Sequence, residues 1–334
     1  MKKIAIIGGG SWGTALAIVL TRSRQAHGVA LWVHDAGVCQ TLRTRRVNEV
    51  YLPGFELPAE VDVTGDLGEA LREAEIVLGV MPSAYARALY TRMLPHLEPR
   101  MVFVSATKGL EHHTLERMTE VLVQVVSLKF TPRVAALSGP SFAREVARGD
   151  PTAVVIASAD PELAASLQEE FSGPTFRLYT NDDVAGVELG GAVKNVIAIA
   201  AGVCAGLGFG HNTIAALITR GLAEMTRLAC ALGARRETLA GLAGMGDLVL
   251  TCTGALSRNR TVGMELGKGR RLDDIISSMR MVAEGVGTTA ATVELARKAH
   301  LEMPITQQMH AVLNQGRAPR EAIRELMERR LKHE

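Results

Sequence analysis

Cysteine is scarce in this chain, and its four cysteines have no regular spacing. They are Cys39, Cys204, Cys230 and Cys252, and no two of them form a C-x-x-C pair. This pattern argues against a zinc site and against a disulfide framework, because both depend on cysteines at recognisable intervals. We therefore expect no bound metal, and we expect the protein to work in the reducing cytoplasm.

The sequence also lacks an excess of charge of either sign. Its 37 Lys and Arg residues nearly balance its 35 Asp and Glu residues, which leaves a formal net charge of +2. Such a chain has no general field that would attract nucleic acid or an anionic membrane. We therefore expect small-molecule partners and no nucleic acid, and any polyanion must be bound by basic residues at particular places.

Two apolar segments resemble targeting or anchoring segments but differ from them in length or composition. Only four apolar residues, 4–7, precede the first glycines, whereas the apolar region of a signal peptide has about 7 to 15. Residues 195–219 carry no acidic or strongly basic side chain and are long enough to span a bilayer. This second run is rich in Gly and Ala and is broken by GLGFGHNT. Between a membrane span and a buried pair of helices, we favour the buried pair, with no stable membrane insertion.

The first half of the sequence alternates between short apolar runs and amphipathic stretches. The apolar runs cover residues 2–8, 29–35, 75–82, 101–109, 133–139, 152–158 and 175–180. This alternation is typical of parallel βαβ units. After residues 181–195 the pattern changes to Ala- and Leu-rich helical periodicity without a convincing strand. The chain is long enough for about two domains, so we expect an α/β domain in residues 1–185 and an all-α domain in residues 186–334.

The stretch IAIIGGGSWGTALA, residues 4–17, places a G-x-G-x-x-G motif directly after the first expected strand. In this motif Gly8 allows a tight turn, Gly10 lets a pyrophosphate approach the backbone, and Gly13 lets the following helix pack on the strand. Ser11 can cap that helix, whose positive end favours phosphate. Alone the motif is weak, since glycine-rich turns also have purely structural uses. At the start of a βαβ series it predicts a doubly wound, Rossmann-type sheet in residues 1–185 that binds a dinucleotide. We expect the helical residues 186–334 to hold the substrate and the catalytic groups.

The end of the second expected strand leaves the choice of dinucleotide open. Asp35 lies where an acid often binds the adenosine ribose of NAD. His34 beside it, with Arg43, Arg45 and Arg46 soon after, can instead receive a 2′-phosphate. A run of arginines on a helix is more often a solvated face. The residues themselves therefore do not decide between NAD and NADP.

Polar residues follow two further strands at the edge where a parallel sheet binds its ligands. Lys108 comes after the strand within residues 101–109, and Ser138, Gly139 and Ser141 form a turn after the strand within residues 133–139. A surface lysine and an ordinary capped turn would explain each one singly. Their occurrence together at strand ends favours a binding site.

The helical part carries polar residues among apolar ones at three places. Lys194 and Asn195 interrupt a run of small apolar residues, where a lysine needs a partner or a purpose. Asp247 lies among small residues, and residues 257–259, Ser-Arg-Asn, precede another helical run. Serine, arginine and asparagine at a helix start can converge on a phosphate. Taken alone, these three residues fit a helix cap with a solvent-facing arginine better.

Six segments together resemble the bacterial NAD(P)-dependent glycerol-3-phosphate dehydrogenases. They are GGGSWGTALA, SATKGLE, SGPSFAREV, VELGGAVKNVIAIAAG, GLAGMGDLVLTCTGALSRNR and VAEGVGTT, in this order across nearly the whole chain. Met81 departs from the valine expected before the proline of VMPS, at a position away from the chemistry.

The resemblance implies reversible reduction of dihydroxyacetone phosphate to sn-glycerol 3-phosphate, which feeds glycerophospholipid synthesis. It also implies NADP or NAD as cofactor, with NADPH used at least as well as NADH, and it leaves a homodimer open. The cofactor-binding residues that it implies, besides the three motif glycines, are Ser11, Trp12, His34, Lys108, Ala143, Arg258, Val282 and Glu284. The implied substrate-binding residues are Lys108, Gly139, Ser141, Lys194, Asp247, Ser257, Arg258 and Asn259.

The resemblance assigns the catalytic steps to Lys194, Lys108 and Asp247. A ketone that receives hydride develops alkoxide charge, which a cation or acid stabilises in the transition state. Lys194 is the implied acid/base; desolvation or the neighbouring charge of Lys108 would bring its pKa toward working pH. Asp247 would orient it.

Two rival functions share some of these features. Another two-domain NAD(P)-dependent dehydrogenase, acting on a hydroxy acid or a sugar acid, would have the glycine motif and a helical second domain. The Ser-Arg-Asn cluster favours a phosphorylated substrate instead. A cofactor-binding sensor without catalysis would need the glycine loop but not Lys194 or Asp247.

Overall fold

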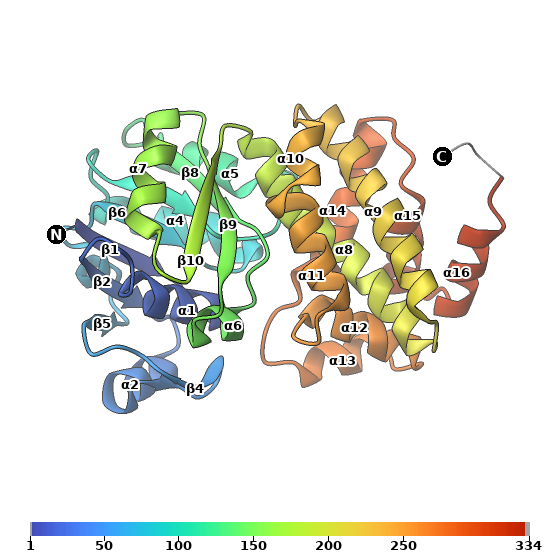
Figure 1. Cartoon of the computed structure of the whole chain (residues 1–334), viewed down its shortest axis with the longest axis horizontal. Helices are drawn as coiled ribbons and strands as arrows, with labels where there is room; N and C mark the ends of the chain where they lie inside the picture. The colour runs from blue at the N-terminus through green and yellow to red at the C-terminus, as the bar shows by residue number, and fades with distance from the viewer. Residues whose placement is uncertain (1, 331–334) are drawn as a thin grey trace. The chain divides into compact units, whose positions relative to one another are not determined.

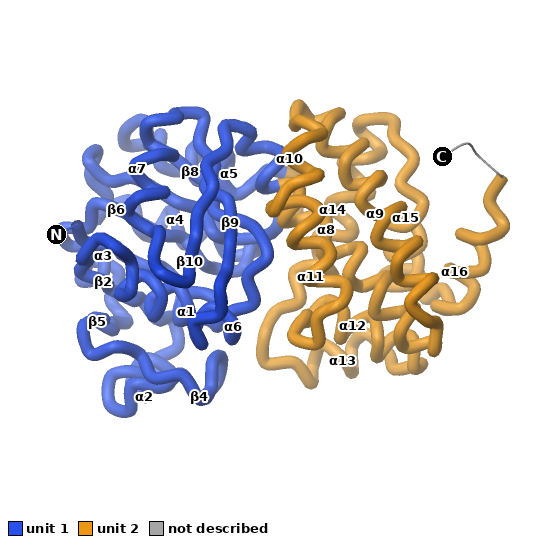
Figure 2. Tube along the Cα trace, in the orientation of Figure 1, with its two compact units in different colours: residues 1–111, 116–188 blue, residues 112–115, 189–334 orange. Residues whose placement is uncertain are grey.

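The structure is a computed structural model that describes residues 2–330, and the chain forms two compact units. Unit 1 comprises the chain up to Glu111 together with Glu116–Glu188, and unit 2 comprises His112–Leu115 and the chain from Leu189 onward (Figure 2). The expected assignment of residues 1–185 to the cofactor and residues 186–334 to the substrate concerns binding and stays a prediction.

Unit 1 is built on an eight-stranded sheet with the order β10-β9-β8-β7-β6-β1-β2-β5 (Figure 1). Its first six strands in the chain reproduce the order of a Rossmann sheet, which reverses direction of winding at β1 and β6. The strands are β1 (Lys2–Ile7), β2 (His27–Trp32), β5 (Val61–Thr64), β6 (Ile76–Gly79), β7 (Val102–Ser105), β8 (Arg133–Ser138), β9 (Thr152–Ala157) and β10 (Phe176–Asn181). Each of the seven apolar runs predicted as strands therefore overlaps one of these strands.

Helices cover both faces of this sheet, as expected for a doubly wound fold. One buried cluster joins alternate strand residues such as Ile4 and Ile6 to α1, α2, α6 and α7, and the other joins Ala5 and Ile7 to α3, α4 and α5. Successive strand residues point to opposite faces, so both faces of β1 are apolar. The helices are α1 (Ser11–Leu20), α2 (Ala36–Arg45), α3 (Leu67–Leu71), α4 (Ala86–Met93), α5 (Met118–Val126), α6 (Ala143–Arg148) and α7 (Pro161–Phe171), with short turns η1 (Ser83–Tyr85) and η2 (Leu94–His96).

The sheet departs at one place from the parallel pairing that βαβ units give, because β9 pairs antiparallel with β8. The six residues of α6 cover about 9 Å at 1.5 Å per residue. The six residues of β8 extend about 20 Å. A helix this short does not return the chain to the opposite edge of the sheet, so β9 starts at the edge where β8 ends. The 11 residues of α7 do cross the sheet, and β10 is parallel to β9.

Three strands of unit 1 were not predicted. Two of them, β3 (Val47–Asn48) and β4 (Leu52–Glu56), form a separate antiparallel pair, and β5 is an edge strand of only four residues. Short strands with few apolar residues carry little periodic signal. The β3–β4 pair is nevertheless important, because it contributes a side chain to the glycine loop.

Unit 2 is helical throughout its described part, as predicted. Its elements are α8 (Val184–Gly206), which begins in unit 1, α9 (His211–Ala231), α10 (Arg236–Ala240), a π-helical turn η3 (Leu242–Gly246), α11 (Asp247–Thr253), α12 (Arg258–Gly267), α13 (Leu272–Ser278), α14 (Glu284–Lys298), α15 (Pro304–Asn314) and α16 (Pro319–Met327). Of the predicted buried pair of helices within residues 195–219, only α8 is buried: the first turns of α9 are mostly exposed or half-buried, and Leu217 is their one buried residue.

The helix α8 is long and apolar enough to cross a membrane by length and composition, but 89% of its most apolar window is buried inside the protein. Glycines let α12 approach it closely. A methyl group on Gly202 would overlap the carbonyl oxygen of Arg260, and one on Gly263 would overlap that of Ile199. Close contact of the two backbones explains why this stretch needs so many small residues, and it holds the start of α12 near Asn195.

Candidate cofactor and substrate sites

The three motif glycines occupy three different environments at the end of β1. Gly8 has a φ of +136°, and a Cβ there would overlap the carbonyl oxygen of Val80. A Cβ on Gly13 would overlap the carbonyl oxygen of Gly8, so helix and strand are in backbone contact. A Cβ on Gly10 would meet nothing within 4 Å. Space beside Gly10 is what a pyrophosphate needs in order to reach the backbone.

The prediction that Ser11 caps the first helix is wrong. The N-cap of α1 is Gly10, and Ser11 is the first helical residue, with no side chain capping this end. The first N–H groups of a helix have no intrahelical partner. Because no side chain caps α1, these groups keep their capacity to bind an anion.

Asn48 supports the glycine loop from the β3–β4 pair, and the sequence analysis missed it. Its fully buried side chain donates to the carbonyl oxygen of Gly9 at 2.9 Å and to Oγ1 of Thr14 at 2.8 Å, and it accepts from the backbone N–H of Tyr51 at 3.1 Å. A single asparagine more than thirty residues from the loop gives no local signal. Its role depends wholly on the packing of the β3–β4 pair.

Trp12 provides a further indication that this loop receives a ligand. Its indole Nε1 is buried and has no hydrogen-bond partner among the described residues. A buried hydrogen-bond donor without a partner costs free energy and is rare in native proteins. Together with the open space at Gly10, this donor fits a loop that is completed by a bound dinucleotide.

The end of β2 presents His34 and Asp35 on the surface, but Asp35 already has a structural role. One carboxylate oxygen of Asp35 accepts from the backbone N–H of Val38 at 2.8 Å and caps α2. Arg46 is also occupied: its guanidinium donates to the carbonyl oxygens of Leu57, Pro58 and Val61. Of the three arginines considered for a 2′-phosphate, Arg43 and Arg45 are exposed.

Lys108 lies against the turn that follows β8. Its Nζ donates to the carbonyl oxygen of Gly139 at 2.7 Å and to Oγ of Ser141 at 3.3 Å. The residues that the sequence predicted from two separate strand ends therefore do come together in unit 1. Ala143, two residues further on, is half-buried and begins α6.

In unit 2, Lys194 forms an ion pair with Asp247 in the interior. The side chain of Lys194 is 5% exposed and that of Asp247 is 1% exposed, and Nζ also donates to Oγ1 of Thr251 at 2.9 Å. Asp247 and Thr251 lie one turn apart on α11, so both face the same lysine on α8. The partner that a buried lysine requires is a carboxylate, and the structure places it at the expected position.

Asn195 and Asn259 link three helices beside this ion pair. Nδ2 of Asn259 donates to Oδ1 of Asn195 at 2.9 Å, and Oδ1 of Asn259 accepts from the N–H of Gly285 at 2.9 Å. Ser257 is buried and caps α12 by accepting from the N–H of Arg260 at 3.2 Å. Two members of the Ser-Arg-Asn cluster thus have structural partners of the kind that the cap interpretation expects.

Arg258 is the member of this cluster that faces solvent. Its Nη1 donates to the carbonyl oxygen of Val282 at 2.8 Å, an exposed residue just before α14. Glu284, the first residue of α14, lies near enough to act on the Arg258 charge. The predicted residues Arg258, Val282 and Glu284 therefore lie together in unit 2.

Comparison with known proteins identifies the family. Residues 3–164 match the family described as NAD-dependent glycerol-3-phosphate dehydrogenase N-terminus, and residues 183–324 match the corresponding C-terminus family. Glycerol-3-phosphate dehydrogenase (NAD(P)+) of Koribacter versatilis is 63% identical over 330 residues, which cover 98% of each chain. The chain belongs to the NAD(P)-dependent glycerol-3-phosphate dehydrogenase family.

Other glycerol-3-phosphate dehydrogenases match over the same length. The enzyme of Geobacter sulfurreducens is 52% identical over 333 residues, 100% of this chain and 99% of the relative. The crystal structure of the enzyme from Coxiella burnetii has a TM-score of 0.93 at 42% identity and covers 98% of this chain and 99% of that chain. The resemblance based on six sequence segments is therefore confirmed at the level of family and fold.

The four cysteines are all free, and three of them are buried. Cys39, Cys204 and Cys252 are buried and free, and Cys230 is exposed and free. Burial raises the pKa of Cys204 to about 11 and that of Cys252 to about 12. No cluster of metal-ligating side chains occurs within the described residues.

Proposed function

We propose that the protein interconverts dihydroxyacetone phosphate and sn-glycerol 3-phosphate, with NAD(P)H as the reductant. The observation that supports this proposal most directly is the buried ion pair of Lys194 and Asp247. A cofactor-binding sensor would have no use for a buried ammonium group, whereas reduction of a ketone requires a cation or acid beside the oxygen that becomes negative.

The chemistry divides between the bound cofactor and the side chains of the protein. When bound, the nicotinamide supplies the hydride that reduces the carbonyl carbon. Lys194 donates a proton to the carbonyl oxygen, which becomes the hydroxyl of the product, and it takes that proton back in the reverse reaction. Asp247 holds the ammonium group and Thr251 accepts one of its protons in a hydrogen bond, so the lysine is oriented before substrate arrives.

We assign the substrate phosphate to the exposed guanidinium of Arg258, because its only described hydrogen bond is to one backbone carbonyl. The remaining N–H donors can bind two oxygens of a phosphate in bidentate fashion. In unit 1, Lys108, Gly139 and Ser141 are the proposed substrate contacts, and Lys108 is also a proposed cofactor contact. These assignments of individual residues remain proposals.

We propose that NADPH is used at least as well as NADH. His34 and the exposed Arg43 and Arg45 can offset a 2′-phosphate, while one oxygen of Asp35 is engaged in capping α2. Steady-state assays with both reductants on dihydroxyacetone phosphate test this. A kcat/KM for NADH more than about tenfold above that for NADPH, equivalent to ~1.4 kcal/mol, would show that Asp35 recognises the ribose.

The same assays separate this function from that of a hydroxy-acid or sugar-acid dehydrogenase. We expect turnover with dihydroxyacetone phosphate and almost none with unphosphorylated dihydroxyacetone or with 2-keto acids. Turnover of a keto acid at a higher kcat/KM than dihydroxyacetone phosphate would overturn the assignment. Delivery of the product to glycerophospholipid synthesis, cytoplasmic location and a homodimeric state stay predictions.

A further inference from the structure

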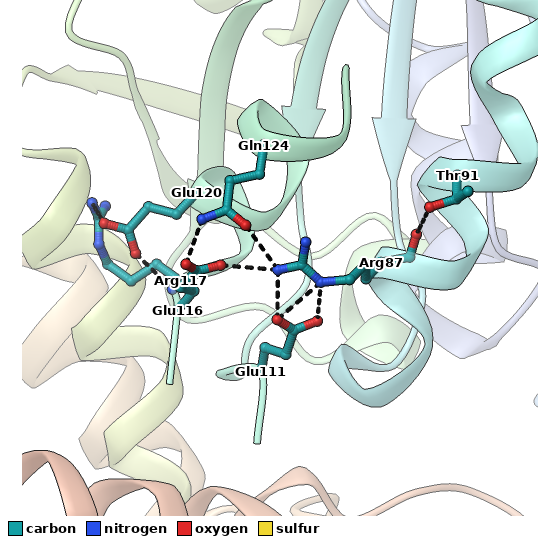
Figure 3. Close-up of polar contacts among 7 residues, drawn as sticks. All are labelled: Arg87, Thr91, Glu111, Glu116, Arg117, Glu120 and Gln124. Atoms are coloured by element: carbon teal, nitrogen blue, oxygen red, sulfur yellow. Dashed lines mark hydrogen bonds and ion pairs between the residues drawn. The ribbon is translucent and has the colours of Figure 1, made fainter. Parts of the chain in front are cut away.

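We propose that Arg87 is a positioning residue for Lys108, because it clamps the loop that carries this lysine. The proposal rests on the proposed function, in which Lys108 contacts substrate and cofactor. Arg87 lies on α4, and the loop runs from the end of β7 at Ser105 to the start of α5 at Met118. Figure 3 shows its guanidinium between the carboxylates of Glu111 and Glu116.

The guanidinium makes several hydrogen bonds to this loop and to α5. Nε donates to both carboxylate oxygens of Glu111, at 2.8 and 3.1 Å, and Nη2 donates to Oε2 of Glu111 at 2.7 Å. Nη2 also donates to Oε2 of Glu116 at 2.9 Å and to Oε1 of Gln124 at 3.0 Å. One side chain thus holds both ends of the turn formed by residues 111–116.

The turn formed by residues 111–116 is closed by a backbone hydrogen bond and contains one unfavourable backbone conformation. The N–H of Glu111 donates to the carbonyl oxygen of Glu116 at 2.9 Å, and Leu110 forms an antiparallel bridge with Arg117. Leu115 has a φ of +67°, an unfavourable left-handed conformation for a branched residue. Such a conformation persists only where the surrounding contacts determine it, and the two clamped glutamates lie on either side of it.

Lys108 lies between two anchored positions of the loop. On one side, the hydroxyl of Thr107 donates to the carbonyl oxygen of Met81 at 2.8 Å. On the other side, three residues further on, Glu111 is held by Arg87. Because both flanking positions are fixed, the Lys108 backbone is fixed, and its Nζ reaches Gly139 and Ser141 in a defined place.

This clamp differs from an ordinary surface ion pair, which contributes little. Exposed pairs are screened and lose side-chain entropy, unless their geometry is bidentate or several charges form a network. Arg87 meets both conditions, and the side chain of Glu111 is only 13% exposed. The other end of the network is secured by Arg117, which pairs with Glu120 and Glu188.

The first experiment measures the loop itself. In Arg87→Ala, we expect amide hydrogen exchange of residues 106–117 to accelerate at least about tenfold, since the Glu111 amide is protected by the closed turn. Arg87→Lys keeps the charge without the fork geometry and should give an intermediate rate. Arg133→Ala is the matched control, because it removes the ion pair to Asp160 in the same unit. Unchanged exchange in Arg87→Ala would overturn the proposal.

The second experiment asks whether Arg87 acts through Lys108. For Arg87→Ala we expect KM for dihydroxyacetone phosphate to rise about tenfold, the size of one charge-assisted hydrogen bond, with a smaller change in kcat. In a Lys108→Met background the same substitution should have almost no further effect on KM. Equal effects in both backgrounds would mean a general structural role and would refute the proposal.

These outcomes are separable from the proposed function. If the wild-type protein does not turn over dihydroxyacetone phosphate, the proposed function fails, and the exchange data alone decide whether Arg87 holds the Lys108 loop. Should Arg87→Ala not fold, Arg87→Lys provides the same exchange and KM comparisons.

Discussion

The two units hold their candidate functional groups in opposite ways. In unit 1 the glycine loop leaves backbone and donor groups open: a Cβ on Gly10 would meet nothing within 4 Å, and Nε1 of Trp12 has no partner among the described residues. In unit 2 the proposed catalytic groups and the amides beside them are buried and bonded to one another, with Lys194 against Asp247 and Asn195 against Asn259, while Arg258 is exposed. The difference fits our proposal that a dinucleotide completes unit 1, whereas in unit 2 the charges of Lys194 and Asp247 are already paired.

Glycine has a different use in each unit, and both uses depend on its having no side chain. In unit 1 Gly8 provides a backbone conformation and Gly10 provides room for a ligand. In unit 2 Gly202 and Gly263 bring two helices into backbone contact. A preorganised charge pair needs rigid helices around it, and close helix packing supplies that rigidity.

The largest effect should follow removal of the unit 2 ammonium group. We expect Lys194→Met to lower kcat by about 10² to 10⁴, the contribution of a general acid. It should also lower the free energy of unfolding by about 3 to 5 kcal/mol, because Asp247 would stay buried without this cation. Steady-state kinetics and chemical denaturation measure the two effects.

A double substitution separates catalysis from stability in that experiment. Lys194→Met with Asp247→Asn removes both charges, so we expect most of the lost stability to return while kcat stays low. If Lys194→Met alone retains more than about a tenth of the wild-type kcat, Lys194 is not the acid/base. The buried ion pair of unit 2 would then be a structural feature and not a catalytic one.

The exposed cation of unit 2 should have a smaller effect, on binding alone. Arg258→Ala removes a charge-assisted contact worth about 1.5 to 3 kcal/mol, so KM for dihydroxyacetone phosphate should rise about 10- to 150-fold. Arg297→Ala is the matched control, because it removes a surface ion pair with Glu294 on α14. An unchanged KM in Arg258→Ala would reduce the Ser-Arg-Asn cluster to a helix cap.

Two alanine substitutions in the glycine loop test the open character of unit 1. Gly10→Ala should fold and should weaken NADPH binding by at least about tenfold, equivalent to ~1.4 kcal/mol, because its methyl group enters the space proposed for pyrophosphate. Gly13→Ala should fail to fold, because its methyl group would overlap the Gly8 carbonyl oxygen. Titration of NADPH fluorescence and thermal unfolding report these effects; wild-type affinity in Gly10→Ala would place the ligand elsewhere.

The smallest effect concerns the reactivity of the thiols, which reports whether the interior of unit 2 becomes accessible to solvent. Since a thiol reacts as its thiolate, Cys204 and Cys252, with pKa values raised to about 11 and about 12 by burial, should not be labelled at pH 8. The exposed Cys230 should be labelled rapidly, and Cys230→Ser should abolish that reaction. Peptide mass spectrometry after labelling identifies the sites. Labelling of Cys252 at the rate of Cys230 would mean that the surroundings of the ion pair open readily.

Sequence patterns predicted the elements more reliably than the contacts among them. The seven apolar runs each overlap a strand, because an apolar run follows directly from burial in a sheet. The antiparallel direction of β9 was not predicted, since it depends on how far α6 carries the chain. The predicted helix cap Ser11 was wrong by one residue, because the N-cap of α1 is Gly10. Helix boundaries are the least certain feature of a local pattern.

The sequence by itself determined the local backbone of the candidate sites: glycine spacing sets the conformation of the loop after β1, and an isolated lysine in an apolar helix must find a partner. Only the tertiary structure decided which partners are used. Asn48 with Gly9, Arg46 with three carbonyl groups, Arg87 with Glu111 and Lys194 with Asp247 join residues that local periodicity does not relate. The physical reason is range: backbone conformation depends on neighbours along the chain, whereas a side chain's partner depends on which elements pack together in space.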